Sequence, residues 1–336
     1  MRQSILIAFF LIFASSGLFF PVNLKAQALG SDIEVTISPE NPGPNQSVYA
    51  SVVSYSTNIN TANITWKING KTSLKGIGEK TFQFVTGDLN KLTTLEIDVI
   101  TNEGDKIVKI ISFKPVAVDL TWQTTGLTPP FFKGRTLFSH ENKITFIAVP
   151  HMIGTNGREV SPNNLVYKWK LNGSVMDSDS GYGKSTYNMT GSIISRPLQV
   201  EVEVTSANTA GVGYAETVVN PIDPTVVLYR KSPLYGIEFQ KALIGTVSMN
   251  DSKEASIIGM PYFFGVSSPY SPQLSYKWSI NGISIDNDTT QTTRVFRQIE
   301  GTNGTSNISL SIENSYKILQ VSRSEFDLTF GQKTAQ

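Results

Sequence analysis

Hydrophobic and polar residues alternate over many short stretches of this 336-residue chain. From Leu95 to Val99, for example, aliphatic residues alternate with Glu96 and Asp98. A two-residue period is typical of a β-strand that buries one of its faces. Similar stretches recur between residues 47 and 330, separated by turn-forming residues, so the pattern predicts an all-β protein.

A short motif, Trp-x-[Ile/Leu]-Asn-Gly, occurs three times, starting at Trp66, Trp169 and Trp278. The motifs are 103 and 109 residues apart. Each Trp falls on the apolar side of the alternation, so we expect all three to be core residues. Asn-Gly directly after a strand is typical of a tight hairpin, because both residues tolerate the positive φ of a type I′ turn. Each motif therefore predicts a strand, a turn and an edge strand within a unit of about 100 residues.

A central Trp before such a hairpin, in units of this length, resembles the immunoglobulin-like β-sandwich. The three units together resemble the tandem bacterial immunoglobulin-like and PKD-like domain proteins of the cell envelope. The resemblance implies an all-β chain of three tandem immunoglobulin-like β-sandwich domains. We expect domains at residues 29–115, 116–222 and 223–336. The linkers near Lys114-Pro115 and at Asn220–Pro224 are short and contain proline, which predicts a stiff row.

The N-terminus has the pattern of a signal peptide. Arg2 precedes an apolar run from Ile5 to Phe13, and Ala26-Gln27-Ala28 fits the small-x-small cleavage pattern. We expect residues 1–28 to be removed. The alternative is an uncleaved anchor helix, because apolar residues resume at Gly17–Phe20. Either reading places the remainder outside the cytoplasm, in the periplasm, at the cell surface or in the medium.

Composition restricts the partners. Loss of Arg2 and Lys25 would leave 26 basic against 27 acidic residues, a net charge of −1, so no basic excess indicates a nucleic-acid partner. The chain has no cysteine, which excludes disulfides and a lipid-modified cysteine. We expect membrane contact only through the signal segment, if it stays uncleaved.

Candidate chemistry is sparse. The only histidines, His140 and His151, would lie too far apart along an extended chain to share a metal ion. Glu201 and Glu203 share one face of a predicted strand, which is compatible with paired-carboxylate chemistry. Val200, Val202 and Val204 alternate with these glutamates and are expected to face the core. We therefore expect both carboxylates on an open sheet surface without a cleft.

Two acidic turns, Asp177–Gly181 and Asp286–Asp288, offer the oxygen ligands that calcium prefers, although ordinary turn chemistry also accounts for them. The sequence has no nucleophile elbow, phosphate-binding glycine loop or zinc-helix motif. We therefore expect no catalytic residue, no metal site and no cofactor, and a protein that is not an enzyme.

Aromatic pairs in units two and three are the remaining candidates. Phe131 and Phe132 lie in a predicted loop, and Tyr262 and Phe263 follow a strand end. We expect these four residues either to seal the junction between the last two domains or to form a binding surface beside it, with unit one as a spacer. The resulting hypothesis is an adhesin-like binding or spacer protein whose partner is an unknown protein or glycan of the envelope. The alternatives are a carbohydrate-binding protein and an accessory component of a secretion or pilus apparatus.

Overall fold

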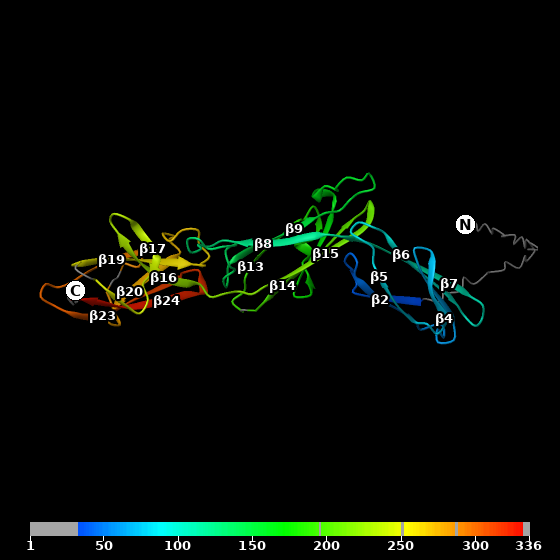
Figure 1. Cartoon of the computed structure of the whole chain (residues 1–336), viewed down its shortest axis with the longest axis horizontal. Coiled ribbons are helices and arrows are strands. Elements are labelled where there is room, and N and C mark those ends of the chain that lie inside the picture. Colours follow the sequence, from blue (N-terminus) through cyan, green and yellow to red (C-terminus); the bar gives the residue numbers. More distant parts are fainter. Residues whose placement is uncertain (1–32, 195, 250–251, 286–287, 332–336) are drawn as a thin grey trace, which may run out of the picture.

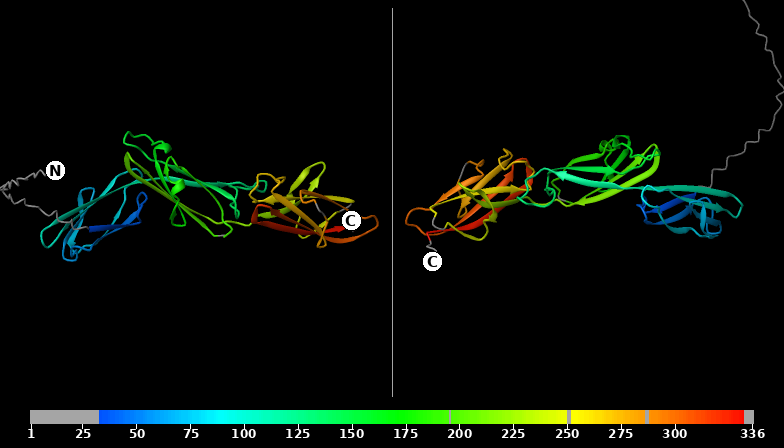
Figure 2. Two further views of the ribbon diagram at one scale, coloured as in Figure 1. Left: turned by 180° about the vertical axis from the view of Figure 1, so that it is seen from behind. Right: turned by 45° about the horizontal axis from the view of Figure 1, so that its top comes forward.

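The computed structural model describes residues 33–194, 196–249, 252–285 and 288–331, so the predicted signal peptide lies outside the described residues. The described chain is all-β, as predicted, and its three units follow one another in a row (Figures 1 and 2). Two single-turn 3₁₀ helices, η1 (Pro162–Asn164) and η2 (Asp177–Asp179), interrupt unit two. In the part of the chain that the structure describes, no helix has the length and apolar character needed to span a membrane.

Unit one is an immunoglobulin-like sandwich of two antiparallel sheets. Alternate side chains of both sheets meet in one core around Trp66, as the two-residue period requires. The first sheet has the order β1-β2-β5 and the second β4-β3-β6-β7. The strands are β1 (Ile33–Ser38), β2 (Ser47–Ser54), β3 (Asn63–Ile68), β4 (Lys71–Ile77), β5 (Thr81–Val85), β6 (Thr93–Ile100) and β7 (Lys106–Val116).

Unit two repeats this arrangement around Trp169. One sheet has the order β13-β9-β8 and the other contains β11-β10-β14-β15, with β12 also paired to β10. The strands are β8 (Val118–Thr124), β9 (Lys143–Pro150), β10 (Val166–Leu171), β11 (Ser174–Val175), β12 (Gly181–Tyr182), β13 (Thr186–Thr190), β14 (Leu198–Ser206) and β15 (Thr209–Val219).

Unit three packs the sheet β17-β16-β19-β22 against β18-β24-β23-β20-β21, with its core around Trp278. The strand β18 runs parallel to β24, whereas the other pairs within this unit are antiparallel. The strands are β16 (Thr225–Ser232), β17 (Gly236–Ala242), β18 (Thr246–Ser248), β19 (Glu254–Tyr262), β20 (Leu274–Ile280), β21 (Ile283–Ser284), β22 (Thr293–Arg297), β23 (Gly304–Asn314) and β24 (Lys317–Phe330).

The Asn-Gly turns form as predicted. Asn69, Asn172 and Asn281 have φ values of 50°, 49° and 50°, and the glycine after each has a φ between 78° and 81°. Two consecutive positive φ values are the geometry of a type I′ turn. Each turn places an edge strand, β4, β11 or β21, beside the Trp strand.

The connection between units one and two differs from the predicted linker. Strand β7 continues through Lys114-Pro115, and its last three residues pair in parallel with Gly211–Gly213 of β15. This pairing joins the second sheets of the two units into one nine-stranded sheet. Glycine permits the approach, because a Cβ at Gly211 would lie 2.9 Å from Cγ2 of Val116. The junction is therefore a shared strand and not a free tether.

Candidate functional site

Each of the three motif tryptophans lies in the hydrophobic core of its unit. Trp66, Trp169 and Trp278 are each 0% exposed. Each indole N–H donates to a backbone carbonyl, at 2.7 Å to Glu79, 2.8 Å to Lys184 and 2.9 Å to Gln291. An aromatic ring lies 5.5 to 6.0 Å from each indole, supplied by Phe82, Tyr187 and Phe296 respectively. A buried indole with its donor satisfied stabilises a core and leaves no group free for a ligand.

The apolar part of the junction between units two and three contains three of the four candidate aromatic residues. Tyr262 and Phe263 are buried, and Phe132 packs edge-on against Phe263 with ring centroids 5.5 Å apart. The amide of Phe263 donates to the carbonyl of Leu127 at 2.8 Å. Ile222 and Leu137 from unit two join Tyr229 and Ile258 from unit three in the same cluster. The loop before β9 is thus part of a core that spans the two units.

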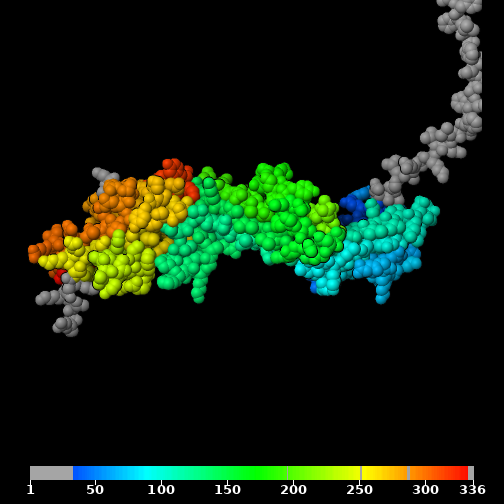
Figure 3. Space-filling view, turned by 90° about the horizontal axis from the view of Figure 1, so that it is seen from above, coloured from blue at the N-terminus to red at the C-terminus, as the bar shows by residue number. Residues whose placement is uncertain are grey.

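Phe131 is the exception, because its side chain is 97% exposed. Its φ of 63° lies in the left-handed region, which is unusual for a bulky residue. The next residue, Phe132, closes the turn by donating from its amide to the carbonyl of Pro129 at 3.1 Å. Consecutive residues of one loop therefore point in opposite directions, Phe132 into the junction and Phe131 into solvent. In Figure 3 the teal part of unit two projects sideways from the row beside unit three.

A polar network completes the same junction. The Gln320 side chain is fully buried; its Nε2 donates to the carbonyl of His140 at 2.8 Å and to Oγ of Ser139 at 3.2 Å. Its Oε1 accepts from the amide of Gly265 at 2.9 Å and from Nδ2 of Asn314 at 3.1 Å. Buried side chains with all partners in place fix the relative position of the groups they join.

Lys317 adds a charged contact across the junction. Its Nζ donates to Oδ1 of Asn142 at 3.2 Å, and Glu141 accepts from the amide of Leu319. Burial lowers the pKa of Lys317, and the Glu141 carboxylate opposes that effect. Together with the aromatic cluster, these bonds join units two and three through both apolar and polar contacts.

The expectation of an open surface at Glu201 and Glu203 is wrong. The loop after β1 folds over this face of unit two and forms a groove of about 560 Å³ lined by Glu201, Lys170 and Tyr214. Asn41 of the same loop donates to Glu203 at 3.4 Å. The pKa of Tyr214 is raised mainly by burial, and the hydrogen bond to the Glu216 carboxylate raises it further. The prediction failed because the covering loop belongs to another unit, so the alternation within unit two carries no trace of it.

The histidines lie apart from one another and have separate carboxylate partners. Nε2 of His140 lies 3.1 Å from Asp223, and Nε2 of His151 lies 2.9 Å from Asp119. Within the described residues, no group of three or more metal-ligating side chains is arranged to hold a metal ion. Of the two acidic turns, the first contains η2 (Asp177–Asp179), and residues 286 and 287 of the second lie outside the described part of the chain.

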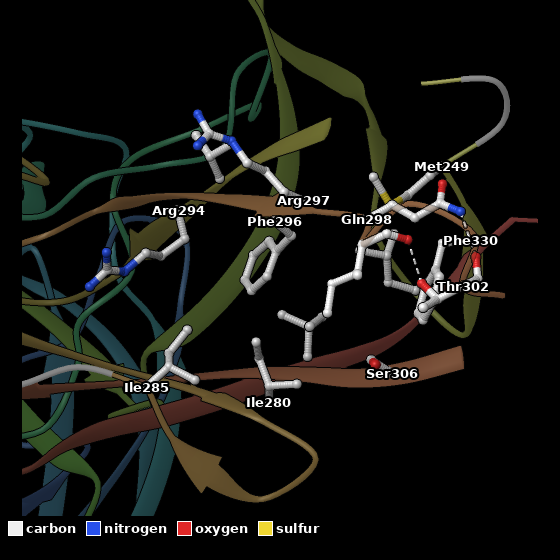
Figure 4. A pocket seen from close by; sticks show the side chains of 14 residues that line it. Met249, Ile280, Ile285, Arg294, Phe296, Arg297, Gln298, Thr302, Ser306 and Phe330 are labelled. Atoms are coloured by element: carbon white, nitrogen blue, oxygen red, sulfur yellow. Dashed lines mark hydrogen bonds between the residues drawn. The ribbon is translucent and has the colours of Figure 1, made fainter. Parts of the chain in front are cut away.

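A pocket that the sequence did not predict lies in unit three, near Phe330 at the end of β24 (Figure 4). Its volume is about 330 Å³. Both sheets contribute apolar side chains, including Phe296 from β22, Ile280 from β20 and Phe330 from β24. These positions continue the regular alternation of their strands, so from sequence alone they are indistinguishable from a closed core.

Comparison with known proteins gives no family. No protein-family model matches the chain, and no curated protein sequence matches it. Among solved structures, the three N-terminal domains of the outer capsid protein Hoc of bacteriophage RB49 are 8% identical, with 90% of this chain and 99% of that chain covered and a TM-score of 0.27. A surface glycan-binding protein (SGBP-B) of Bacteroides ovatus, solved with a mixed-linkage heptasaccharide, is 13% identical over 89% of this chain and 70% of that chain, with a TM-score of 0.22. A bacterial ice-binding adhesin is 9% identical over 88% and 96%, with a TM-score of 0.23. Likeness at this level supports no inference about function.

Proposed function

We propose that this chain is an exported, non-catalytic binding protein of the bacterial envelope, related to the immunoglobulin-like and PKD-like surface proteins that its motifs resemble. In this proposal residues 1–28 are a cleaved signal peptide, and domains at 29–115, 116–222 and 223–336 form a stiff adhesin-like rod. Unit one acts as the spacer, and the joined units two and three present the binding loop.

One observation carries the proposal: a fully exposed Phe131 stands on a loop whose base is buried. Exposed aromatic residues are frequent binding anchors, because burying one ring against a partner removes a large apolar area from water. Anchoring of the neighbouring Phe132 in the junction reduces the ordering cost that a loose loop would incur on binding. The positive φ of Phe131 adds local strain of a kind that concentrates at functional positions.

The test is binding of the labelled mature protein to intact cells and envelope fractions. Phe131→Ala should weaken binding by roughly thirtyfold, the effect of losing about 2 kcal/mol at an interface anchor. Its fold should be unchanged, because the ring contributes nothing to a core. Tyr182→Ala is the matched control, since Tyr182 is 65% exposed in the same unit. Equal binding by Phe131→Ala and the unaltered protein would refute the proposed site.

Treatment of the envelope fraction then separates the partner classes. Loss of binding after protease treatment would identify a protein partner. Loss after periodate oxidation, which cleaves vicinal diols, would instead identify a glycan and favour the carbohydrate-binding alternative.

A further inference from the structure

The pocket of unit three has the features of a small-molecule site, and none of its lining residues belongs to unit two or to the Phe131 loop. Its floor consists of core side chains that are at most 7% exposed, namely Met249, Phe296, Ile308 and Leu328. A volume of about 330 Å³ is at the lower end of the range for ligand sites. The pocket therefore suits a compact apolar body.

Aliphatic side chains continue from this floor to the rim of the pocket. Ile285, Val295 and Ile299 line it and are 38%, 50% and 75% exposed. Large apolar side chains that stand in water beside a cavity favour a ligand that covers them. An alkyl or aryl body would therefore contact both the floor and the rim.

The charged groups near the pocket already have partners. Arg297 lies on the opposite face of β22 from Phe296 and pairs with Glu254 at 2.8 Å. Arg294 is engaged within the protein as well, and in Figure 4 both guanidinium groups lie away from the ring of Phe296. The lining residues that the structure describes include no carboxylate. An ion buried in this pocket would therefore lack a counter-charge, which is costly, whereas a neutral molecule would not incur that cost.

One wall of the pocket is polar and uncharged. Nε2 of Gln298 donates to the carbonyl of Thr302 at 2.6 Å, which holds the amide in place (Figure 4). Gln298 and Ser306 are both partly buried, and within the described residues neither Oε1 of Gln298 nor Oγ of Ser306 has a hydrogen-bond partner. An amide oxygen accepts, and a hydroxyl both donates and accepts, so the two atoms together match the hydroxyl group of a ligand.

We propose that this pocket binds a small neutral amphiphile, an alcohol or a phenol, with its alkyl or aryl body on the Phe296 floor and its hydroxyl at the wall of Gln298 and Ser306. The ligand hydroxyl donates to Oε1 of Gln298 and accepts from the hydroxyl of Ser306. The site goes beyond the envelope-binding loop of the proposed function, so either can fail without affecting the other.

The experiment compares three ligands that share an octyl chain and differ in the head group: octanol, octanoate and octylammonium. Binding to the mature protein is measured at neutral pH by calorimetry and by methyl NMR. Octanol should bind roughly tenfold or more tightly than either ion, because only the alcohol leaves no charge buried without a partner. It should also shift the methyl signals of Met249, Ile280 and Ile308. Equal affinity for the alcohol and an ion, or octanol binding without these shifts, would overturn the proposal.

Substitutions on β23 locate the site. Ser306→Leu should fill the pocket and abolish octanol binding. Ser311→Leu is the matched control, because it makes the same change on the opposite face of β23, away from the pocket, and should bind octanol as the unaltered protein does. Circular dichroism checks the fold of both variants. Ser306→Ala keeps the pocket open and removes one hydrogen bond, so it should weaken octanol binding about fivefold. Full binding by Ser306→Leu, an equal loss in Ser311→Leu, or unchanged affinity in Ser306→Ala would contradict the assignment.

Discussion

Gln320 offers a quantitative test of the rigid junction between units two and three. Gln320→Met keeps the length of the side chain and removes four hydrogen bonds, two of which cross to Ser139 and His140. A neutral hydrogen bond contributes roughly 0.5–1.5 kcal/mol, and a buried group left without a partner costs about 1–3 kcal/mol. Part of this loss will be relieved by relaxation, so we expect the free energy of unfolding to fall by about 3 kcal/mol.

Differential scanning calorimetry is the assay. If units two and three unfold as one body of just over 200 residues, a loss of ~3 kcal/mol should lower their transition by roughly 6–12 °C. The control is Gln83→Met in unit one. The Gln83 side chain is exposed, and its one hydrogen bond among the described residues is to Oγ of Ser47 at 2.7 Å, so the thermal transitions of this variant should move little. A shift for Gln320→Met no larger than that of the control would refute the argument that the buried network holds the junction.

Three further predictions follow from the structure. Trp169→Ala should destabilise unit two by about 3–5 kcal/mol and Trp169→Phe by less, as measured by urea unfolding; equal losses would contradict the indole's place in the core. The neighbouring carboxylates, Asp119 first, raise the pKa of His151 above its usual 6.5, so NMR titration should give a higher value that falls in Asp119→Asn. Because the folded-state pKa is the higher one, this contribution to stability is complete below pH 6.5 and is lost as the pH rises through the folded pKa. Gly211→Ala would place a Cβ 2.9 Å from Cγ2 of Val116, so it should speed hydrogen exchange at Val116 by disturbing the β7–β15 pairing; unchanged exchange would contradict that pairing.

The strands and hairpins could be predicted because their information is local. Alternation sets which side chains face the core, and Asn-Gly sets each turn, so β6 and the motif hairpins form close to the expected residues. The connection after Phe113 could not be predicted in the same way. Lys114-Pro115 has the composition of a linker, yet it becomes strand because Gly211 and Gly213, almost a hundred residues later, let β7 approach β15.

The candidate site also depends on contacts between distant parts of the chain, which local sequence patterns do not reveal. Phe131 and Phe132 are identical and adjacent, and only the position of Phe263 in the next unit decides which one is buried. Gln320 is one polar residue within an alternating strand, and its burial depends on the carbonyl of His140 reaching it from unit two. Contacts between units leave no period in the sequence, so neither the junctions nor the groove over Glu201 could be predicted. The pocket of unit three escaped prediction for a different reason, because its lining residues keep the alternation of a closed core.

The central claim, that the loop of Phe131 meets a partner at the envelope, is tested most directly by photo-cross-linking in the producing cells. A benzoylphenylalanine placed at residue 131 keeps an aromatic ring at the tip of the anchored loop, and the same group at residue 182 probes an exposed site of the same unit. The account predicts one discrete, light-dependent conjugate from position 131 and none from position 182. The absence of a conjugate from position 131, or the same conjugate from both positions, would contradict it.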